Sequence, residues 1–174
     1  MTVLETERLS LRRVTVDDAQ FILTLLNEPS FLRYIGDKQV RNLEDARQYI
    51  LNGPVASWER NNFGLCLVEL KESQTPIGMC GLVKREELPE PDIGFALLPD
   101  FWDKGFAFEA ATAVLQDARE RLRLDRVLAI TSLDNDASIN LLQRLGFNFE
   151  RVIKLSPEKE QLRLFAFYLE SKER

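Results

Sequence analysis

Residues 92–131 contain a strand–helix–strand pattern, which restricts the fold of this chain more than any other segment. Asp92–Leu98 is a short apolar run stopped by a proline, which predicts a strand and its end. Gly105–Leu122 carries apolar residues at helical spacing, and Arg126–Thr131 is a second apolar run, typical of a strand buried on both faces. Two such strands joined by a helix are expected to lie parallel, with a right-handed crossover.

The remaining segments add strands and helices around this unit. Apolar runs and apolar–polar alternation predict five further strands, at residues 9–14, 63–70, 76–83, 147–152 and 162–169. Helical spacing predicts helices from Thr15 to near Pro29, over residues 31–35, from Asn42 to about Trp58, and over residues 136–145 between an N-cap at Asn135 and a left-handed stop at Gly146. No repeat, linker or low-complexity tract divides the 174 residues, so we expect one α/β domain (residues 1–174) in which helices cover a mixed sheet.

The chain contains no histidine, which limits the chemistry available to it. Ser-His-Asp and Cys-His catalytic sites are impossible without imidazole, and so is any zinc site that requires it. Cys66 and Cys80 lie in separate apolar segments without metal-ligand spacing, so we expect two reduced core residues and no bound metal. An enzyme of this composition must work through backbone groups, carboxylates, hydroxyls or a bound cofactor.

Charge and hydropathy indicate where the protein works. The formal net charge is −5 and the basic residues are scattered, which argues against a nucleic-acid-binding face. The acidic balance is a weak hint of a cationic substrate, or it serves solubility alone. No apolar run reaches the roughly 18 residues needed to cross a bilayer. The N-terminus carries acids where a signal peptide would be basic and then apolar. We therefore expect a cytoplasmic protein with neither a membrane nor a nucleic-acid partner.

The loop before the long helix is a candidate anion site. The first N–H groups of a helix have no partner inside it, and the helix dipole makes that end positive. Gly105 and Ala107 are small enough to let a phosphate approach the backbone. The same glycine also suits an ordinary strand-to-helix turn. The loop matches neither a P-loop nor a three-glycine dinucleotide fingerprint.

Three segments together resemble the GCN5-related N-acetyltransferase (GNAT) family. The acetyl-CoA loop of the family reads Gln/Arg-x-x-Gly-x-Gly/Ala, and this chain has Trp102-Asp-Lys-Gly-Phe-Ala107, with the tryptophan as a departure. Asn135–Phe147 is similar to the Asn-x-x-Ser motif that ends in Leu-Gly-Phe. The opening segment, Glu5–Arg13, and the tryptophan loop both look like the branch of ribosomal-protein N-terminal (RimJ/RimL-type) acetyltransferases. The resemblance spans residues 5 to about 170.

The resemblance implies an acyl-CoA N-acyltransferase fold, with a largely antiparallel sheet of about six or seven strands flanked by helices. It implies acetyl-CoA as the acetyl donor and no metal. The strand Phe95–Leu98 is expected to pair through its backbone with the pantetheine arm, and the amides of residues 102–107 to hold the pyrophosphate. The implied cofactor-binding residues are Phe95, Ala96, Leu97, Leu98, Trp102, Lys104, Gly105, Phe106, Ala107, Asn135 and Ser138.

Catalysis by such an enzyme needs a base for the amine and an acid for the departing thiolate. Asp92 and Glu109 are candidate bases, although Glu109 is more simply a helix-dipole acid and Asp92 suits a structural role equally well. Many family members protonate the thiolate with a tyrosine four residues before the Gly-Phe pair, where this chain has Leu142. Ser138 lies one turn earlier on the helix and is the expected proton donor, although it also suits helix capping. Asn135 is expected to cap the helix, to bind the pantetheine arm, or both.

The sequence leaves the acceptor open. The branch resemblance favours the α-amine of a protein or peptide N-terminus, and a polyamine, an aminoglycoside and a free amino acid are the alternatives. Residues 31–35 and the helix ending near Trp58 are expected to border the amine pocket; they are aromatic and of mixed charge. Leu142 leaves room for a non-catalytic CoA-binding module, and a nucleotide-binding module ranks lower. A monomer and a homodimer are both compatible with the sequence, since the apolar edge of the last strand would permit a dimer.

Overall fold

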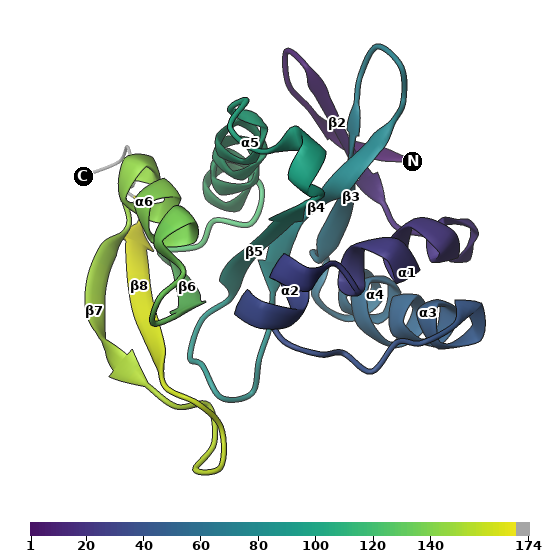
Figure 1. Cartoon of the computed structure of the whole chain (residues 1–174). Coiled ribbons are helices and arrows are strands. Elements are labelled where there is room, and N and C mark those ends of the chain that lie inside the picture. The colour runs from purple at the N-terminus through teal and green to yellow at the C-terminus, as the bar shows by residue number, and fades with distance from the viewer. Residues whose placement is uncertain (170–174) are drawn as a thin grey trace.

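The computed structural model describes residues 1–169, and one eight-stranded sheet runs through it (Figure 1). Across the sheet the order is β1 (Thr2–Glu5), β2 (Leu9–Arg13), β3 (Leu65–Leu70), β4 (Pro76–Val83), β5 (Asp92–Leu97), β6 (Arg126–Ser132), β8 (Leu162–Tyr168) and β7 (Asn148–Ile153). All neighbours are antiparallel except β5 and β6, which are parallel. The expected mixed, largely antiparallel sheet is confirmed. It has one strand more than the upper estimate, because β1 is a four-residue edge strand, too short to show an alternating pattern.

The helices fall close to their expected positions. They are the 3₁₀ turn η1 (Val16–Asp18) with α1 (Ala19–Leu26), α2 (Pro29–Tyr34), α3 (Leu43–Ile50), the π turn η2 (Leu51–Val55), α4 (Ala56–Asn61), the 3₁₀ turn η3 (Pro99–Phe101), α5 (Phe106–Glu120) and α6 (Asp136–Leu145). The helix predicted from Asn42 is thus α3, η2 and α4 in succession, capped by the Asn42 side chain, which accepts from the amide of Asp45 at 2.8 Å. Pro54 sits in the π turn, where its missing N–H breaks the α-helical ladder.

Helices cover both faces of the N-terminal half of the sheet. Successive side chains of a strand point to opposite faces. On β3, Cys66 and Val68 accordingly pack in a core with α5, whereas Leu67 packs in a second core with α1 and α3. Cys66 lies opposite Cys80 on β4, and both are buried free thiols, as expected. Burial raises the pKa of Cys66 to about 12, so this thiol is unreactive near neutral pH.

The sheet divides between its two parallel strands. β5 and β6 share a single register pair, Asp92 with Leu128, whereas β6 pairs with β8 over its whole length. Figure 1 shows β5 and β6 diverging beyond that pair. Because parallel strands end at the same edge, the loops that start α5 and α6 both lie at this divergence, the position where open α/β sheets bind ligands.

The outer edges of the sheet correct one expectation. The last strand, β8, lies between β6 and β7, so both of its edges are paired and it offers no edge for a dimer. The edge strands are β1 and β7. Within residues 1–169, none of the helices combines the length and the apolar character that crossing a bilayer requires.

Candidate active site

A cleft of about 470 Å³ opens where β5 and β6 diverge, and we call it the β5–β6 cleft. Its walls come from β5, the loop before α5, the start of α6, and α1 and α2. The structure brings nine of the expected cofactor-binding residues to this cleft: Phe95, Ala96, Leu97, Trp102, Gly105, Phe106, Ala107, Asn135 and Ser138. Leu98 instead packs toward the α1 core, and Lys104 is exposed in the loop outside the lining.

The loop before α5 presents its backbone to the cleft. Gly105 is the N-cap of α5 with φ +83°, a conformation that glycine adopts without strain. The first helical bond runs from the Glu109 amide to the Gly105 carbonyl at 3.0 Å, which leaves the preceding amides without a partner inside the helix. Trp102 Nε1 donates to the Leu97 carbonyl at 2.9 Å and so ties the loop back to β5. This geometry provides N–H donors at the positive end of a 15-residue helix.

The edge of β5 that faces the cleft has a free backbone position. The Pro91 carbonyl points toward β6, where it accepts from Leu128 at 3.0 Å. Since direction alternates along a strand, the backbone groups of Phe95 and Leu97 point the same way. Trp102 takes the Leu97 carbonyl, and Phe95 has no strand partner on this side within the described chain. Phe95 can therefore form a backbone pair with an extended ligand.

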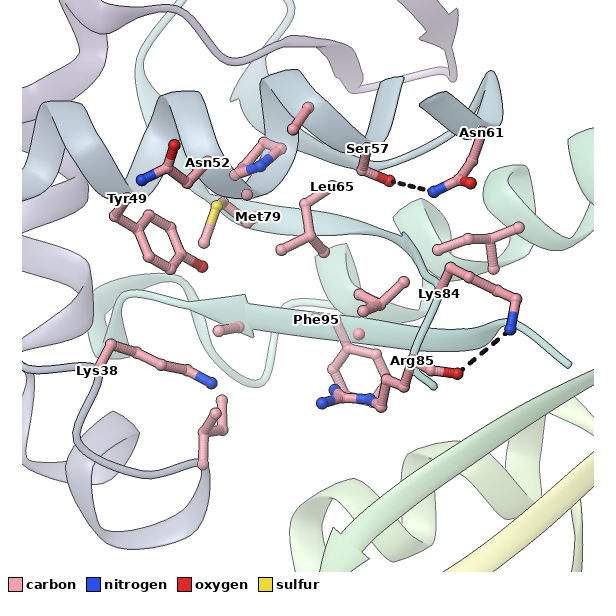
Figure 2. Close-up of a pocket in the computed structure, with 18 of the residues that line it drawn as sticks. Lys38, Tyr49, Asn52, Ser57, Asn61, Leu65, Met79, Lys84, Arg85 and Phe95 are labelled. Carbon is pink, nitrogen blue, oxygen red and sulfur yellow. Dashed lines mark hydrogen bonds between the residues drawn. The ribbon is translucent and has the colours of Figure 1, made fainter. Parts of the chain in front are cut away.

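A second cavity of about 310 Å³ lies beside the first, and we call it the α3–α4 pocket. Its walls come from α2, the loop at Lys38, the segment from α3 to α4, and strands β3, β4 and β5. Figure 2 shows Tyr49, Met79 and Phe95 among the lining residues. Phe31, Ile35 and residues of the helical segment from Tyr49 to Asn61 line it. These are parts of the two segments that the sequence predicts to border the amine pocket. Four residues line both cavities: Phe31, Ile35, Phe95 and Ala96. The two cavities thus meet at the middle of β5.

Sequence comparison decides the family. Residues 8–148 match the acetyltransferase (GNAT) domain. The uncharacterized N-acetyltransferase YoaA of Bacillus subtilis (strain 168) is 31% identical over 154 residues, which cover 87% of this chain and 86% of that protein. The chain belongs to the GNAT family. It is an N-acetyltransferase.

Solved structures agree with this GNAT assignment. An acetyltransferase from Agrobacterium tumefaciens str. C58 is 24% identical, with a TM-score of 0.81 over 97% of this chain and 95% of that one. RimL, a ribosomal L7/L12 α-N-protein acetyltransferase solved with coenzyme A, is 17% identical, with a TM-score of 0.83 over 97% of this chain and 98% of that one. At these identities the likeness establishes the GNAT fold.

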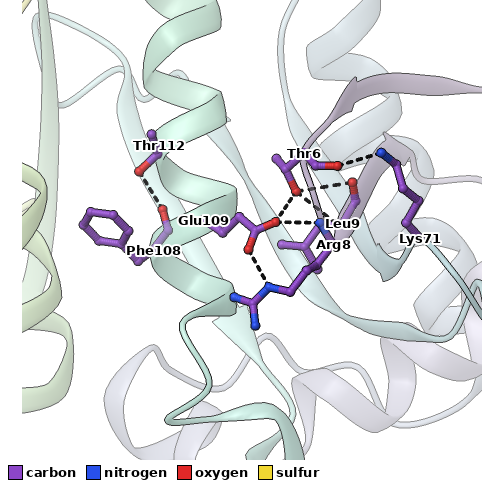
Figure 3. A network of polar contacts seen from close by, with 7 residues as sticks. All are labelled: Thr6, Arg8, Leu9, Lys71, Phe108, Glu109 and Thr112. Atoms are coloured by element: carbon purple, nitrogen blue, oxygen red, sulfur yellow. Dashed lines mark hydrogen bonds and ion pairs between the residues drawn. The ribbon is translucent and has the colours of Figure 1, made fainter.

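In this GNAT enzyme, hydrogen bonds occupy the Glu109 carboxylate, so it is not available as a free base. Its carboxylate accepts from Thr6 Oγ1, from the Arg8 amide at 2.9 Å and from Arg8 Nε at 2.8 Å, as Figure 3 shows. Burial by itself would raise the pKa of Glu109, but these hydrogen bonds and the charge of Arg8 hold it below its usual value. Glu109 lines neither cavity and instead fastens the β1–β2 turn to α5. The local-packing interpretation of Glu109 fits this geometry.

Sequence reasoning missed Arg8, which lies over the loop of the acetyltransferase. Its guanidinium stacks on the Phe106 ring, 4.4 Å from the centroid, and a Cβ added to Gly105 would lie 3.2 Å from Arg8 Nη2. The side chain is 43% exposed, and within residues 1–169 its η nitrogens have no hydrogen-bond partner, so they can meet an anion at the loop. No local pattern reveals this role, because only the folded sheet brings residue 8 to the start of α5.

Ser138 and Leu142 occupy different surroundings on α6. Ser138 lines the β5–β6 cleft, and its amide donates to Asn135 Oδ1 at 3.2 Å, so Asn135 caps the helix as expected. Leu142 is 1% exposed and packs in the core, whereas Leu141 faces the cleft. Tyr34, on α2, belongs to the segment expected to border the amine pocket, but it lines the β5–β6 cleft.

Asp92 lies behind the α3–α4 pocket and lines neither cavity. It is 1% exposed, and its Oδ1 accepts from Arg85 Nε at 2.9 Å. Burial raises the pKa of Asp92 in spite of the neighbouring charge of Arg85. Arg85 lines the pocket and stays protonated in proteins, so it cannot pass a proton on to Asp92. A role of Asp92 as the base remains a prediction, and its contact with Arg85 favours an orienting role.

Proposed function

We propose that this enzyme transfers the acetyl group of acetyl-CoA, bound in the β5–β6 cleft, to a primary amine that enters from the α3–α4 pocket. The observation that carries the proposal is the meeting of both cavities at Phe95 and Ala96. A pantetheine arm paired with Phe95 would place its thioester there, within reach of an amine from the other side. Positioning of the two reactants supplies much of the rate gain for such a transfer.

The anion-holding part of the proposal rests on the loop before α5. The Trp102 amide donates to the Pro99 carbonyl at 3.1 Å and is not available, whereas the amides that follow it in the loop have no backbone partner within residues 1–169. These amides and the positive end of the helix suit the pyrophosphate of CoA, with Gly105 and Ala107 allowing close approach. Arg8 adds a guanidinium at the same place. That the structurally similar RimL was solved with coenzyme A supports the same assignment.

In the proposed reaction the amine nitrogen attacks the thioester carbonyl carbon, the carbon–sulfur bond breaks, and an amide forms. The amine loses one proton, and the thiolate of CoA takes one up. Ser138 is the proposed proton donor to the sulfur, because it lines the cleft and carries a hydroxyl. Tyr34 lines the same cleft and carries a second hydroxyl that could support this transfer.

The acceptor is proposed to be the α-amine of a protein or peptide. Among residues 1–169, none of those that line the α3–α4 pocket is aspartate or glutamate, so this lining offers no carboxylate base. Near pH 8 roughly half of peptide α-amines are neutral, against fewer than about one in a hundred lysine side chains. An α-amine therefore needs the least help, and the α-N-protein specificity named for RimL points the same way.

Release of free thiol from acetyl-CoA tests this function directly. The acceptor panel comprises peptides with varied N-termini, spermidine, an aminoglycoside and free amino acids. We expect thiol release with peptides, and mass spectrometry should place the acetyl group on the α-nitrogen. Binding of acetyl-CoA by calorimetry without thiol release from any acceptor would contradict the proposal.

A further inference from the structure

The α3–α4 pocket carries positive charge on every charged residue that lines it. These residues are Lys38, Arg60, Lys84 and Arg85. Within residues 1–169, Arg85 alone among them has a carboxylate partner, Asp92. The bordering segments predicted a pocket of mixed charge, whereas the charged residues that line it are all cationic. The pocket is cationic in a protein whose net charge is −5.

Three of the polar side chains converge on one space. Figure 2 shows the Lys38 ammonium group, the Tyr49 hydroxyl and the Arg85 guanidinium turned toward the same part of the pocket, beside Phe95. Partial desolvation, together with the charges of Arg85 and Lys159, lowers the pKa of Lys38. Burial raises the pKa of Tyr49, so its hydroxyl stays protonated and can donate.

Asp92 positions Arg85 but leaves part of its guanidinium able to bind a ligand. Asp92 engages only Nε, at 2.9 Å, from a site that is itself inaccessible to solvent. The two η nitrogens have no hydrogen-bond partner in the described part of the chain, and a guanidinium presents them as a fork that matches a carboxylate or a phosphate. Asp92 thus positions the fork, and its negative charge is shielded from the pocket by Arg85.

We propose that the acceptor carries an anionic group, a carboxylate or a phosphate, close to its amine, and that Lys38, Tyr49 and Arg85 bind that group. This inference rests on the proposed function, because it requires that the α3–α4 pocket receive the acceptor. An anion there pairs with the Lys38 and Tyr49 donors and with the η nitrogens of Arg85, which have no hydrogen-bond partner within residues 1–169, and it orients the amine toward the shared wall at Phe95 and Ala96. Polyamines and aminoglycosides bring positive charge to a positive pocket and are poor acceptors.

Matched peptides test the inference. Hexapeptides that begin with the same serine and differ only at positions two and three carry Asp-Glu, Asn-Gln, phosphoserine-Gln or Lys-Lys, and free glutamate and an aminoalkyl phosphate serve as small anionic amines. We expect kcat/KM to be at least about 10-fold higher for anionic acceptors than for their neutral counterparts. Hydrogen bonds to charged groups are strong enough to supply this difference, because a tenfold change in kcat/KM corresponds to a small free energy. The peptide and small-molecule arms tell the two sources of the anion apart.

Variants assign the effect to the pocket. Lys38→Met and Arg85→Gln should remove most of the preference for anionic acceptors, with the KM for acetyl-CoA unchanged, and Lys38→Glu should shift the preference toward Lys-Lys. Arg47→Gln, which removes an equal charge paired with Glu44 on the exposed side of α3, is the matched control. Circular dichroism checks folding of each variant. Equal rates for acidic, neutral and basic acceptors would overturn the inference and leave the proposed function intact, whereas the absence of thiol release with every acceptor would count against the proposed function itself.

Discussion

The two cavities on either side of β5 differ in the groups that each offers to an anion. In the β5–β6 cleft, the donors expected to meet phosphate are backbone amides at the start of α5, and the wall includes carboxylates, among them Glu28 and Asp136. In the α3–α4 pocket, the donors are long cationic side chains, and no carboxylate from residues 1–169 lines the wall. Backbone donors fix position, whereas side-chain cations select for charge. The comparison suggests that the cofactor is recognised by shape and the acceptor by its anion.

The largest effect is expected from blocking the backbone site in the loop before α5. Gly105→Glu forces a side chain into a left-handed conformation, brings it against Arg8 and adds a negative charge where phosphate should bind. We expect acetyl-CoA affinity to fall about 100-fold or more, measured by calorimetry. Lys104→Glu changes charge in the same loop outside the cleft lining and should cost much less. Equal losses in the two folded variants would mean that charge alone, and not backbone approach, governs binding.

A second variant separates chemistry from binding in the β5–β6 cleft. Ser138→Ala removes the proposed proton donor but leaves the capping oxygen of Asn135 in place. We expect kcat to fall about 100-fold, the lower end for general acid catalysis, with little change in the KM for acetyl-CoA. Tyr34→Phe, measured in parallel, shows whether the second hydroxyl contributes. A parallel loss of turnover and cofactor affinity in Ser138→Ala would mean that Ser138 binds the cofactor and does not donate the proton.

A smaller effect tests whether the cofactor side also uses a side-chain cation. Arg8→Ala should raise the KM for acetyl-CoA about 5-fold and leave kcat nearly unchanged, because an exposed charge contributes modestly to binding. Arg8→Lys should recover part of the loss, as an ammonium keeps the charge but not the fork. The difference between wild type and Arg8→Ala should shrink as salt rises. A KM that is the same in all three proteins would remove Arg8 from the cofactor site.

The two cavities also differ in how far the sequence could predict them. The amide site is local: a strand end, Gly105 and a helix start follow one another in the chain, so motif and spacing indicate it. The sheet and most helices followed from periodicity for the same reason. The cationic site draws Lys38, Tyr49 and Arg85 from three separate segments, and nothing short of the folded chain brings them together. Arg8 and the inward position of Leu142 belong to the same class, because tertiary packing alone decides them.

The smallest expected effect concerns Glu109, which holds Arg8 in place over the loop. Its pKa is lowered in the folded state, so its contribution to stability is present above its unfolded-state pKa and is lost as pH falls through the folded-state pKa. Glu109→Gln should therefore lower the free energy of unfolding by about 1 kcal/mol at pH 7, a modest value because the network borders solvent.

Urea titrations of Glu109→Gln and wild type should converge as the pH falls through the low end of the carboxylate range. Glu44→Gln, at an exposed ion pair on α3, should have nearly the same free energy of unfolding as wild type, both at pH 7 and at the low end of the carboxylate range. If Glu109 serves mainly to anchor Arg8, its glutamine variant should also raise the KM for acetyl-CoA, but less than Arg8→Ala does. An unchanged KM with reduced stability would separate the two roles: Glu109 would then hold the β1–β2 turn to α5, while Arg8 finds its position on Phe106 without it.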